Sequence, residues 1–184
     1  MTSEILHPES NVRILRPSEV RKLIDAIPKN INRERFEVLL FTGCRYTELV
    51  DAFGKKERID GKFLKIKNTK AKVKEKFRYV RLNNQGLRAV DYFMRHEKPL
   101  PSYVTWNENL NRWSKKAHLD PKGISVKTTR KTWESWLVTM YPMQITQIFL
   151  SMGHESTTAL KHYLQLPFTE QDKEDMKYYT DGWI

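Results

Sequence analysis

Residues 127–140, KTTRKTWESWLVTM, form a segment typical of a buried amphipathic helix, and the chain around it is organised in the same way. Proline and glycine interrupt the sequence on both sides, at Pro121, Gly123, Pro142 and Gly153, and such residues punctuate helices. The second half of the chain therefore predicts consecutive helices over residues 107–117, 127–140, 144–152 and 157–164.

The first half predicts three helices, a hairpin and a fourth helix. Helices are expected over residues 17–27, 35–41 and 46–53, the second ending at Gly43. Strand-like residues at 63–66 and 77–82 flank the lysine-rich stretch 67–76, as in a β-hairpin with a cationic tip. A further helix is expected from Asn84 to just before Pro99. The predicted fold is mostly α with a small antiparallel β-sheet, of the α+β class.

Three regions are expected along the chain. Residues 1–14 show no periodic pattern and are interpreted as an N-terminal arm, residues 15–166 as one catalytic domain, and residues 167–184 as a C-terminal tail helix. The tail contains the acidic residues Glu170, Asp172, Glu174 and Asp175. It can dock on its own domain or on a neighbouring protomer, and the sequence leaves both alternatives open.

Positive charge is concentrated in one segment. The chain carries a formal charge of +11, and residues 55–81 hold 12 lysines and arginines against 3 acidic residues. Such a segment suits a phosphate backbone, because each neutralised phosphate releases condensed counterions. A solvated, lysine-rich hairpin is the alternative, and charge alone does not decide between them.

Other features limit the class of protein. The sequence contains neither a long apolar run nor a secretory signal, so an intracellular protein without membrane contact is expected, in the cytoplasm of a prokaryotic host. The single cysteine, Cys44, makes no internal disulfide and is expected to pack in the core. No carboxylate cluster or His/Cys set suggests a metal, so neither a metal nor another cofactor is expected.

Three polar strings carry the candidate chemistry. They are TGCRYTEL at residues 42–49, KTTR at 127–130 and LSMGH at 150–154, the last followed by Tyr163 nine residues after His154. Arginine suits phosphate recognition because its planar fork donates two hydrogen bonds and stays protonated. Taken singly, Arg45 is more typical of a helix-start residue paired with Glu48, and Arg130 of a solvated helix position.

In this order and with these gaps, the strings resemble the three conserved boxes of the tyrosine recombinases, a family related in its catalytic domain to type IB topoisomerases. The resemblance spans roughly residues 15–163. It implies that Arg45 and Arg130 clamp the scissile phosphate, that His154 donates a hydrogen bond to it, and that Tyr163 attacks it. The product of that attack is a 3′-phosphotyrosyl link that preserves bond energy for rejoining.

The hairpin is expected to supply the general acid. In the family a lysine at the hairpin tip protonates the leaving 5′ oxygen, and Lys70 aligns best with it, with Lys72 as the alternative. The remaining cations of the hairpin are expected to contact the DNA backbone, and they are Lys65, Lys67, Lys72, Lys74, Lys76 and Arg78.

Lys127 departs from the common family pattern, in which histidine begins the second box. Lysine donates to a phosphate oxygen but is a poor neutral base, so the group that accepts the proton of Tyr163 stays open. Some integrases of archaeal viruses and plasmids resemble this variant. Lys127 is therefore retained with Arg45, Lys70, Arg130, His154 and Tyr163 in the expected catalytic set.

The resemblance implies double-stranded DNA as the partner, with a monomer in solution that assembles as a homo-tetramer on DNA. The function expected is that of a site-specific recombinase, or integrase. Two alternatives remain: a type IB topoisomerase-like relaxase and a non-catalytic DNA-binding protein of the same fold. Members of the family usually carry an additional N-terminal helical domain that clamps DNA.

Overall fold

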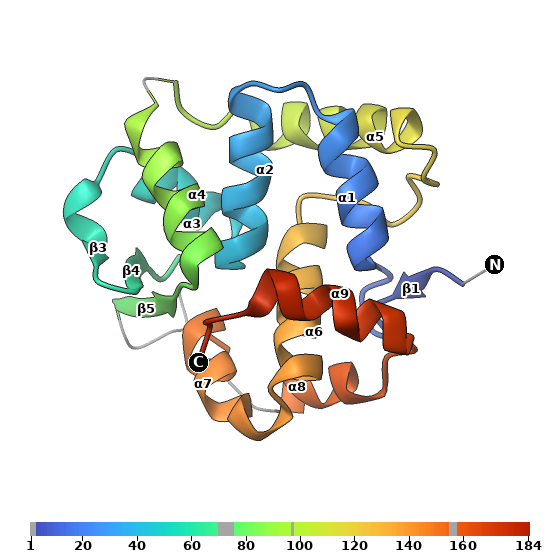
Figure 1. The fold of residues 1–184 in the computed structure, drawn as a ribbon. Coiled ribbons are helices and arrows are strands. Elements are labelled where there is room, and N and C mark those ends of the chain that lie inside the picture. Colours follow the sequence, from blue (N-terminus) through green and yellow to red (C-terminus); the bar gives the residue numbers. More distant parts are fainter. Residues whose placement is uncertain (1–2, 70–75, 97, 155–157) are drawn as a thin grey trace.

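A computed structural model of the 184-residue chain describes residues 3–69, 76–96, 98–154 and 158–184. Helices dominate, and two small antiparallel sheets accompany them (Figure 1). The predicted class, mostly α with a small antiparallel sheet, is confirmed. The helices are α1 (Pro17–Ala26), α2 (Ile31–Thr42), α3 (Tyr46–Ala52), α4 (Asn84–Arg95), α5 (Tyr103–Lys116), α6 (Thr128–Met140), α7 (Ile145–Met152), α8 (Thr158–Lys161) and α9 (Glu170–Thr180). Short 3₁₀ turns cover Lys56–Arg58, Pro142–Gln144 and His162–Gln165.

Helix α6 runs through the middle of the molecule (Figure 1) and packs against α2, α7 and α9. Its indole side chains Trp133 and Trp136 have no exposed surface. Burying two such large side chains contributes several kcal/mol of hydrophobic stabilisation, so the helix that begins with the KTTR string anchors the core. Residues near its start are consequently held in fixed positions.

The larger sheet has the strand order β3 (Ile59–Asp60), β4 (Phe63–Lys67) and β5 (Phe77–Arg81) and lies at one edge of the molecule. In the register of β4 and β5, Leu64 faces Val80 and Ile66 faces Arg78. Since alternate residues of a strand share a face, all four point into the protein, and each is buried. The predicted hairpin is therefore present, and its inward face includes one arginine.

The N-terminal residues are more structured than the sequence pattern suggests. Strands β1 (Ile5–Leu6) and β2 (Arg13–Ile14) form an antiparallel pair, and β2 packs on α6. The Arg13 guanidinium contacts Glu4 at 2.7 Å and Glu19 at 2.5 Å. Two-residue strands are too short to leave a periodic signal, which explains why the sequence suggested only an arm.

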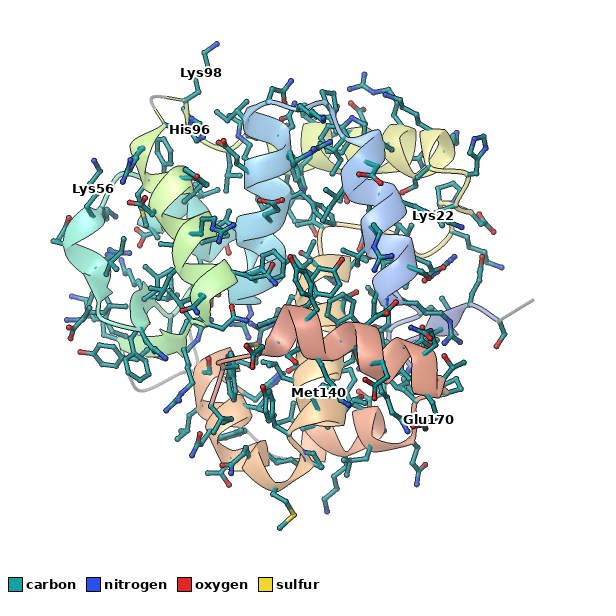
Figure 2. All side chains as sticks on the ribbon, viewed as in Figure 1. Lys22, Lys56, His96, Lys98, Met140 and Glu170 are labelled. Carbon is teal, nitrogen blue, oxygen red and sulfur yellow. The ribbon has the colours of Figure 1, made fainter. Side chains whose placement is uncertain are left out.

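The tail helix α9 packs on α1 and α6 of its own chain. Arg16 is hydrogen bonded to Asp172 in a buried ion pair, and Asn83 donates to the backbone oxygen of Tyr179 at 2.8 Å. Of the acidic tail residues, Asp172 is thus directed inward, whereas Glu170 projects away from the ribbon (Figure 2). Within the described residues, no helix has both the length and the apolar character needed to cross a bilayer.

Candidate active site

Two left-handed glycines bring the first and third strings together. Gly43 ends α2 with a φ of 62°, and Gly153 ends α7 with a φ of 66°. A Cβ on Gly43 would lie 2.8 Å from the sulfur of Met152, and one on Gly153 would lie 2.7 Å from Cδ of Arg78. Only glycine fits both the backbone conformation and the space, so the two helix ends approach closely.

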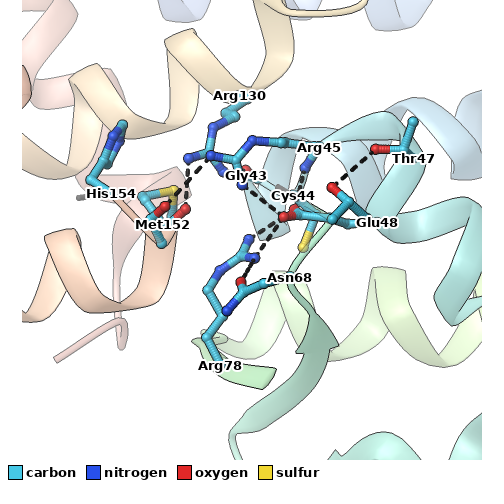
Figure 3. A network of polar contacts seen from close by, with 12 residues as sticks. Gly43, Cys44, Arg45, Thr47, Glu48, Asn68, Arg78, Arg130, Met152 and His154 are labelled. Carbon is cyan, nitrogen blue, oxygen red and sulfur yellow. Dashed lines mark hydrogen bonds and ion pairs between the residues drawn. The ribbon is translucent and has the colours of Figure 1, made fainter. Parts of the chain in front are cut away.

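Arg130 bridges these helix ends from α6 (Figure 3). Its Nη1 donates to the carbonyl of Gly43 at 2.8 Å, and its Nη2 donates to the carbonyl of Met152 at 2.6 Å. Carbonyls at the C-terminus of a helix lack helical partners and carry partial negative charge, so they are suitable acceptors for a guanidinium. Arg130 is therefore held rigidly at the base of the site.

Arg45 is the N-cap residue of α3 and is fixed by a buried carboxylate. Its Nη1 donates to Oε1 of Glu48 at 2.7 Å, and its Nη2 reaches the carbonyl of Gly153 at 3.5 Å. The pairing with Glu48 that the sequence suggested is present, but it does not remove Arg45 from the site. The guanidinium is partly exposed and lies beside Arg130 (Figure 3).

Glu48 is also the partner of Arg78. The two form a two-pronged ion pair, with Nη1 at 2.6 Å from Oε1 and Nη2 at 2.8 Å from Oε2. Nε of Arg78 donates to the carbonyl of Ser151 at 3.0 Å. Burial would raise the pKa of Glu48, but the hydrogen bonds and charge of Arg78 hold it at about 2.

These contacts correct the expectation for Arg78. Arg78 is expected to contact the DNA backbone, yet its side chain is only 5% exposed. Its position on the inward face of β5 explains the difference, because it shares that face with Val80. Arg78 supports Glu48 and the end of α7 rather than extending from the hairpin surface.

The candidate clamps open onto one pocket of about 430 Å³. Five basic side chains line it, namely Arg45, Lys127, Arg130, Lys131 and His154, together with Cys44, Tyr46, Thr47, Tyr103 and Val126. Among the described residues of this lining, none carries a carboxylate. Such a cluster of positive donors around a concave site is suited to an anion such as a phosphate group.

Tyr163 is not among the residues that line this pocket and lies in the 3₁₀ turn His162–Gln165, which packs on α6. Its side chain is buried, and its hydroxyl donates to Oε2 of Glu134 at 2.7 Å. Nζ of Lys131 donates to the same hydroxyl at 3.0 Å. Burial and the neighbouring Glu134 carboxylate raise the pKa of Tyr163 above its ordinary value, so the phenol is protonated in this arrangement.

His154 connects the pocket with the buried tyrosine. It lines the pocket, and its Nε2 forms a hydrogen bond with Oε1 of Glu134. Lys131 likewise lines the pocket and contacts Tyr163. The polar groups at the start of α6 therefore join the anion pocket to the tyrosine hydroxyl.

Three residues around Tyr163 were not predicted from the sequence: His7, Lys131 and Glu134. The His7 ring lies 5.5 Å from the Tyr163 ring, and its Nε2 is 3.3 Å from Nζ of Lys131. The one available signal was Glu134, a carboxylate between Trp133 and Trp136 on the buried face of a helix. A buried charge requires polar partners, so its position indicates a polar cluster. His7 gave no such signal, because its contacts with Lys131 and Tyr163 join residues more than a hundred positions apart.

The hairpin cations have different surroundings. Lys67 and Lys76 are exposed, and Lys65 is half-buried with its Nζ 4.9 Å above the ring of Phe77. Lys70, Lys72 and Lys74 lie outside the described residues. Thr69, the last described residue before them, places its hydroxyl 3.5 Å from that of Thr47, which lines the pocket.

Two further expectations concern Cys44 and metals. The Cys44 thiol is buried, as expected, and burial raises its pKa to about 11. In the described part of the chain, histidine, cysteine and acidic side chains form no group of three or more that could hold a metal ion.

No protein-family model matches the sequence, and no curated protein is similar to it. Solved structures do share its fold. The crystal structure of XerA recombinase is 18% identical with a TM-score of 0.66, and the match covers 91% of this chain and 65% of that one. The Tn1549 transposon integrase in complex with circular intermediate DNA is 17% identical, with a TM-score of 0.68 and coverage of 90% and 66%.

A lambda integrase dimer bound to a core site is 19% identical, with a TM-score of 0.63, and the match covers 83% of this chain and 59% of that one. The chain thus spans about two thirds or less of the length of these proteins. The predicted fold, that of a tyrosine recombinase catalytic domain, is confirmed by these likenesses.

Proposed function

We propose that this chain is the catalytic domain of a site-specific DNA recombinase that cuts and rejoins DNA through a phosphotyrosine intermediate. One observation carries the proposal: Arg45, Arg130 and His154, which come from three distant strings, line one cationic pocket. A fold shared with recombinases and integrases, two of them solved with DNA, supports the same function.

The chemistry follows from the charges of the pocket. Transesterification of a phosphodiester places additional negative charge on the non-bridging oxygens in the transition state. Arg45, Arg130 and His154 donate hydrogen bonds to those oxygens, and Lys127 at the pocket rim adds a further positive charge. Because Arg45 and Arg130 are fixed by hydrogen bonds, little reorganisation is required when the phosphate binds.

Tyr163 attacks the phosphorus and becomes linked to the 3′ side of the break. Its approach requires the tyrosine oxygen to move from its buried position toward the pocket, which is lined by Lys131, the side chain that donates to the Tyr163 hydroxyl. The leaving 5′ oxygen takes a proton from a lysine of the hairpin tip, with Lys70 as the first candidate and Lys72 as the second. The contact between Thr69 and Thr47 supports this assignment, because it brings the base of the tip to the pocket edge.

The hairpin and its surroundings bind the DNA backbone, and Lys65, Lys67 and Lys76 are the described cations assigned to that contact. Lys72 and Lys74 belong to the same proposal. Binding should weaken steeply with salt, because each neutralised phosphate releases counterions. We further propose assembly as a tetramer on DNA inside a prokaryotic cell, and a relationship to integrases of archaeal viruses and plasmids that rests on Lys127.

The test traps the covalent intermediate. Nicked duplexes drawn from candidate attachment-site sequence lose a short 5′ fragment after cleavage, so rejoining fails and the protein–DNA adduct accumulates. Wild-type protein should give an adduct on a denaturing gel, whereas Tyr163→Phe should bind the DNA with unchanged affinity and give none. An adduct that persists in Tyr163→Phe would move the nucleophile elsewhere, and binding without any adduct would favour a non-catalytic DNA-binding protein.

A further inference from the structure

Glu134 occupies an unusual position in this site. Its carboxylate has no exposed surface, and its two oxygens have different partners. Oε1 is hydrogen bonded to Nε2 of His154, and Oε2 accepts the hydroxyl hydrogen of Tyr163 at 2.7 Å. A single buried carboxylate therefore connects a group assigned to phosphate binding with the group assigned to attack.

Its neighbours on α6 give this carboxylate a specific setting. Arg130 and Lys131 lie four and three residues earlier, on the same side of the helix. Nζ of Lys131 is 3.9 Å from Oε2 of Glu134 and 3.0 Å from the hydroxyl of Tyr163. The described polar contacts of that hydroxyl are thus one ammonium, which only donates, and one carboxylate, which accepts.

We propose that Glu134 is the general base that accepts the proton of Tyr163 during DNA cleavage. The inference rests on the proposed function. It assigns the acceptor of the Tyr163 proton, which stayed open because Lys127 stands where the family pattern has histidine. In the step, the O–H bond of Tyr163 breaks and its proton passes to Oε2 of Glu134. The freed electron pair forms the bond to phosphorus, the bond from phosphorus to the 5′ oxygen breaks, and that oxygen takes its proton from a hairpin ammonium.

Lys131 assists the same step from the other side of the hydroxyl. Its ammonium already donates to the tyrosine oxygen, and this hydrogen bond strengthens as negative charge develops there. Before DNA binds, the Tyr163 hydroxyl is therefore protonated. Glu134 is positioned to accept its proton, and Lys131 donates a hydrogen bond to its oxygen.

His154 couples this proton transfer to substrate binding. Burial would raise the pKa of Glu134, but the hydrogen bond from His154 and the charge of Arg130 hold it at about 2. When a phosphate in the pocket takes over the hydrogen bond from His154, the carboxylate loses the strongest of these interactions and becomes a better base. The nucleophile is consequently activated only when the phosphate is present.

The test compares Glu134→Gln with wild type in single-turnover adduct formation on the nicked duplex. Glutamine keeps the size of the side chain but accepts no proton, so the rate should fall by about 100-fold or more with unchanged DNA affinity. Glu170→Gln is the matched control, because the same chemical change falls on a side chain that is 87% exposed and projects into solvent (Figure 2), and its rate should equal that of wild type.

A sulfur substitution separates the two proton transfers. In a duplex with sulfur in place of the 5′ bridging oxygen, the leaving group is a thiolate, which needs no proton because a thiol has a pKa of about 8.5. The Glu134→Gln defect should persist on this substrate, since it affects the nucleophile and not the leaving group. Rescue by sulfur, or a Glu134→Gln rate within about threefold of wild type, would overturn the proposal.

A second pair of variants covers the case in which Glu134→Gln does not fold, as judged by circular dichroism. Glu134→Asp and Glu134→Asn have the same length and differ in the ability to accept a proton, so the aspartate variant should cleave at least about tenfold faster. Equal rates would refute the role of Glu134. If wild type itself forms no adduct, the proposed function fails, whereas an adduct in wild type and equal rates in the variants refute this inference alone.

Discussion

Removing the charge of Glu48 should destabilise the fold strongly. Glu48 has no exposed surface and accepts hydrogen bonds from Arg45 and Arg78, the latter with only 5% of its side chain exposed (Figure 3). In Glu48→Gln the guanidinium of Arg78 remains buried without a counter-charge. Breaking a buried ion pair in this way costs about 3–5 kcal/mol, and we expect about 3 kcal/mol because glutamine retains one acceptor oxygen.

Thermal unfolding followed by circular dichroism measures this loss. In a chain of this size each kcal/mol lowers the melting temperature by about 2–4 °C, so a decrease of about 6–12 °C is expected. Asp91→Asn is the control, because it breaks the exposed ion pair with Arg95 and should cost less than about 0.5 kcal/mol. A Glu48→Gln protein that melts within about 2 °C of the control would show that the buried Arg78 guanidinium does not depend on this counter-charge.

Two further predictions concern stability. The pKa values of Glu48 and Glu134 are each held at about 2, below their ordinary value, so their contribution to stability is complete above about pH 5 and is lost as the pH falls toward 2. Urea unfolding should therefore give equal midpoints at about pH 7 and 5 and a lower midpoint at about pH 3, and an unchanged midpoint at about pH 3 would contradict this. Gly153→Ala should destabilise the protein more than Gly54→Ala. Both glycines have positive φ, but a Cβ on Gly153 would lie 2.7 Å from Arg78, whereas nothing lies within 4 Å of a Cβ on Gly54. Equal free energies of unfolding for the two variants would argue against that contact.

The fold was predictable where local signals agree. Gly43 and Gly153 are terminators with positive φ, and the alternation of apolar residues in 63–66 and 77–82 places the hairpin correctly. The start of α5 was predicted four residues late, because its capping residue, Ser102, follows two prolines that suggest a loop. The pair of strands at 5–6 and 13–14 is determined by packing on α6 rather than by pattern.

The site was predictable only in part. Arg45, Arg130 and His154 line one pocket, as the motifs predicted, because all three are residue types that donate hydrogen bonds to a phosphate. The surroundings of Tyr163 were not predictable, because Glu134 and Lys131 resemble ordinary polar positions of a helix until the tertiary contacts are known. Arg78 shows the converse error: a cation in a basic segment was assigned to the surface, although strand alternation directs it inward.

Identification of the residue that becomes attached to DNA is the measurement that most sharply tests whether Tyr163 is the nucleophile. The adduct formed on the nicked duplex would be digested with protease and nuclease, and the nucleotide-bearing peptide would be sequenced by mass spectrometry. We expect a single modified residue, Tyr163, linked to a 3′ phosphate. A nucleotide on another tyrosine, or on a different residue type, would contradict it.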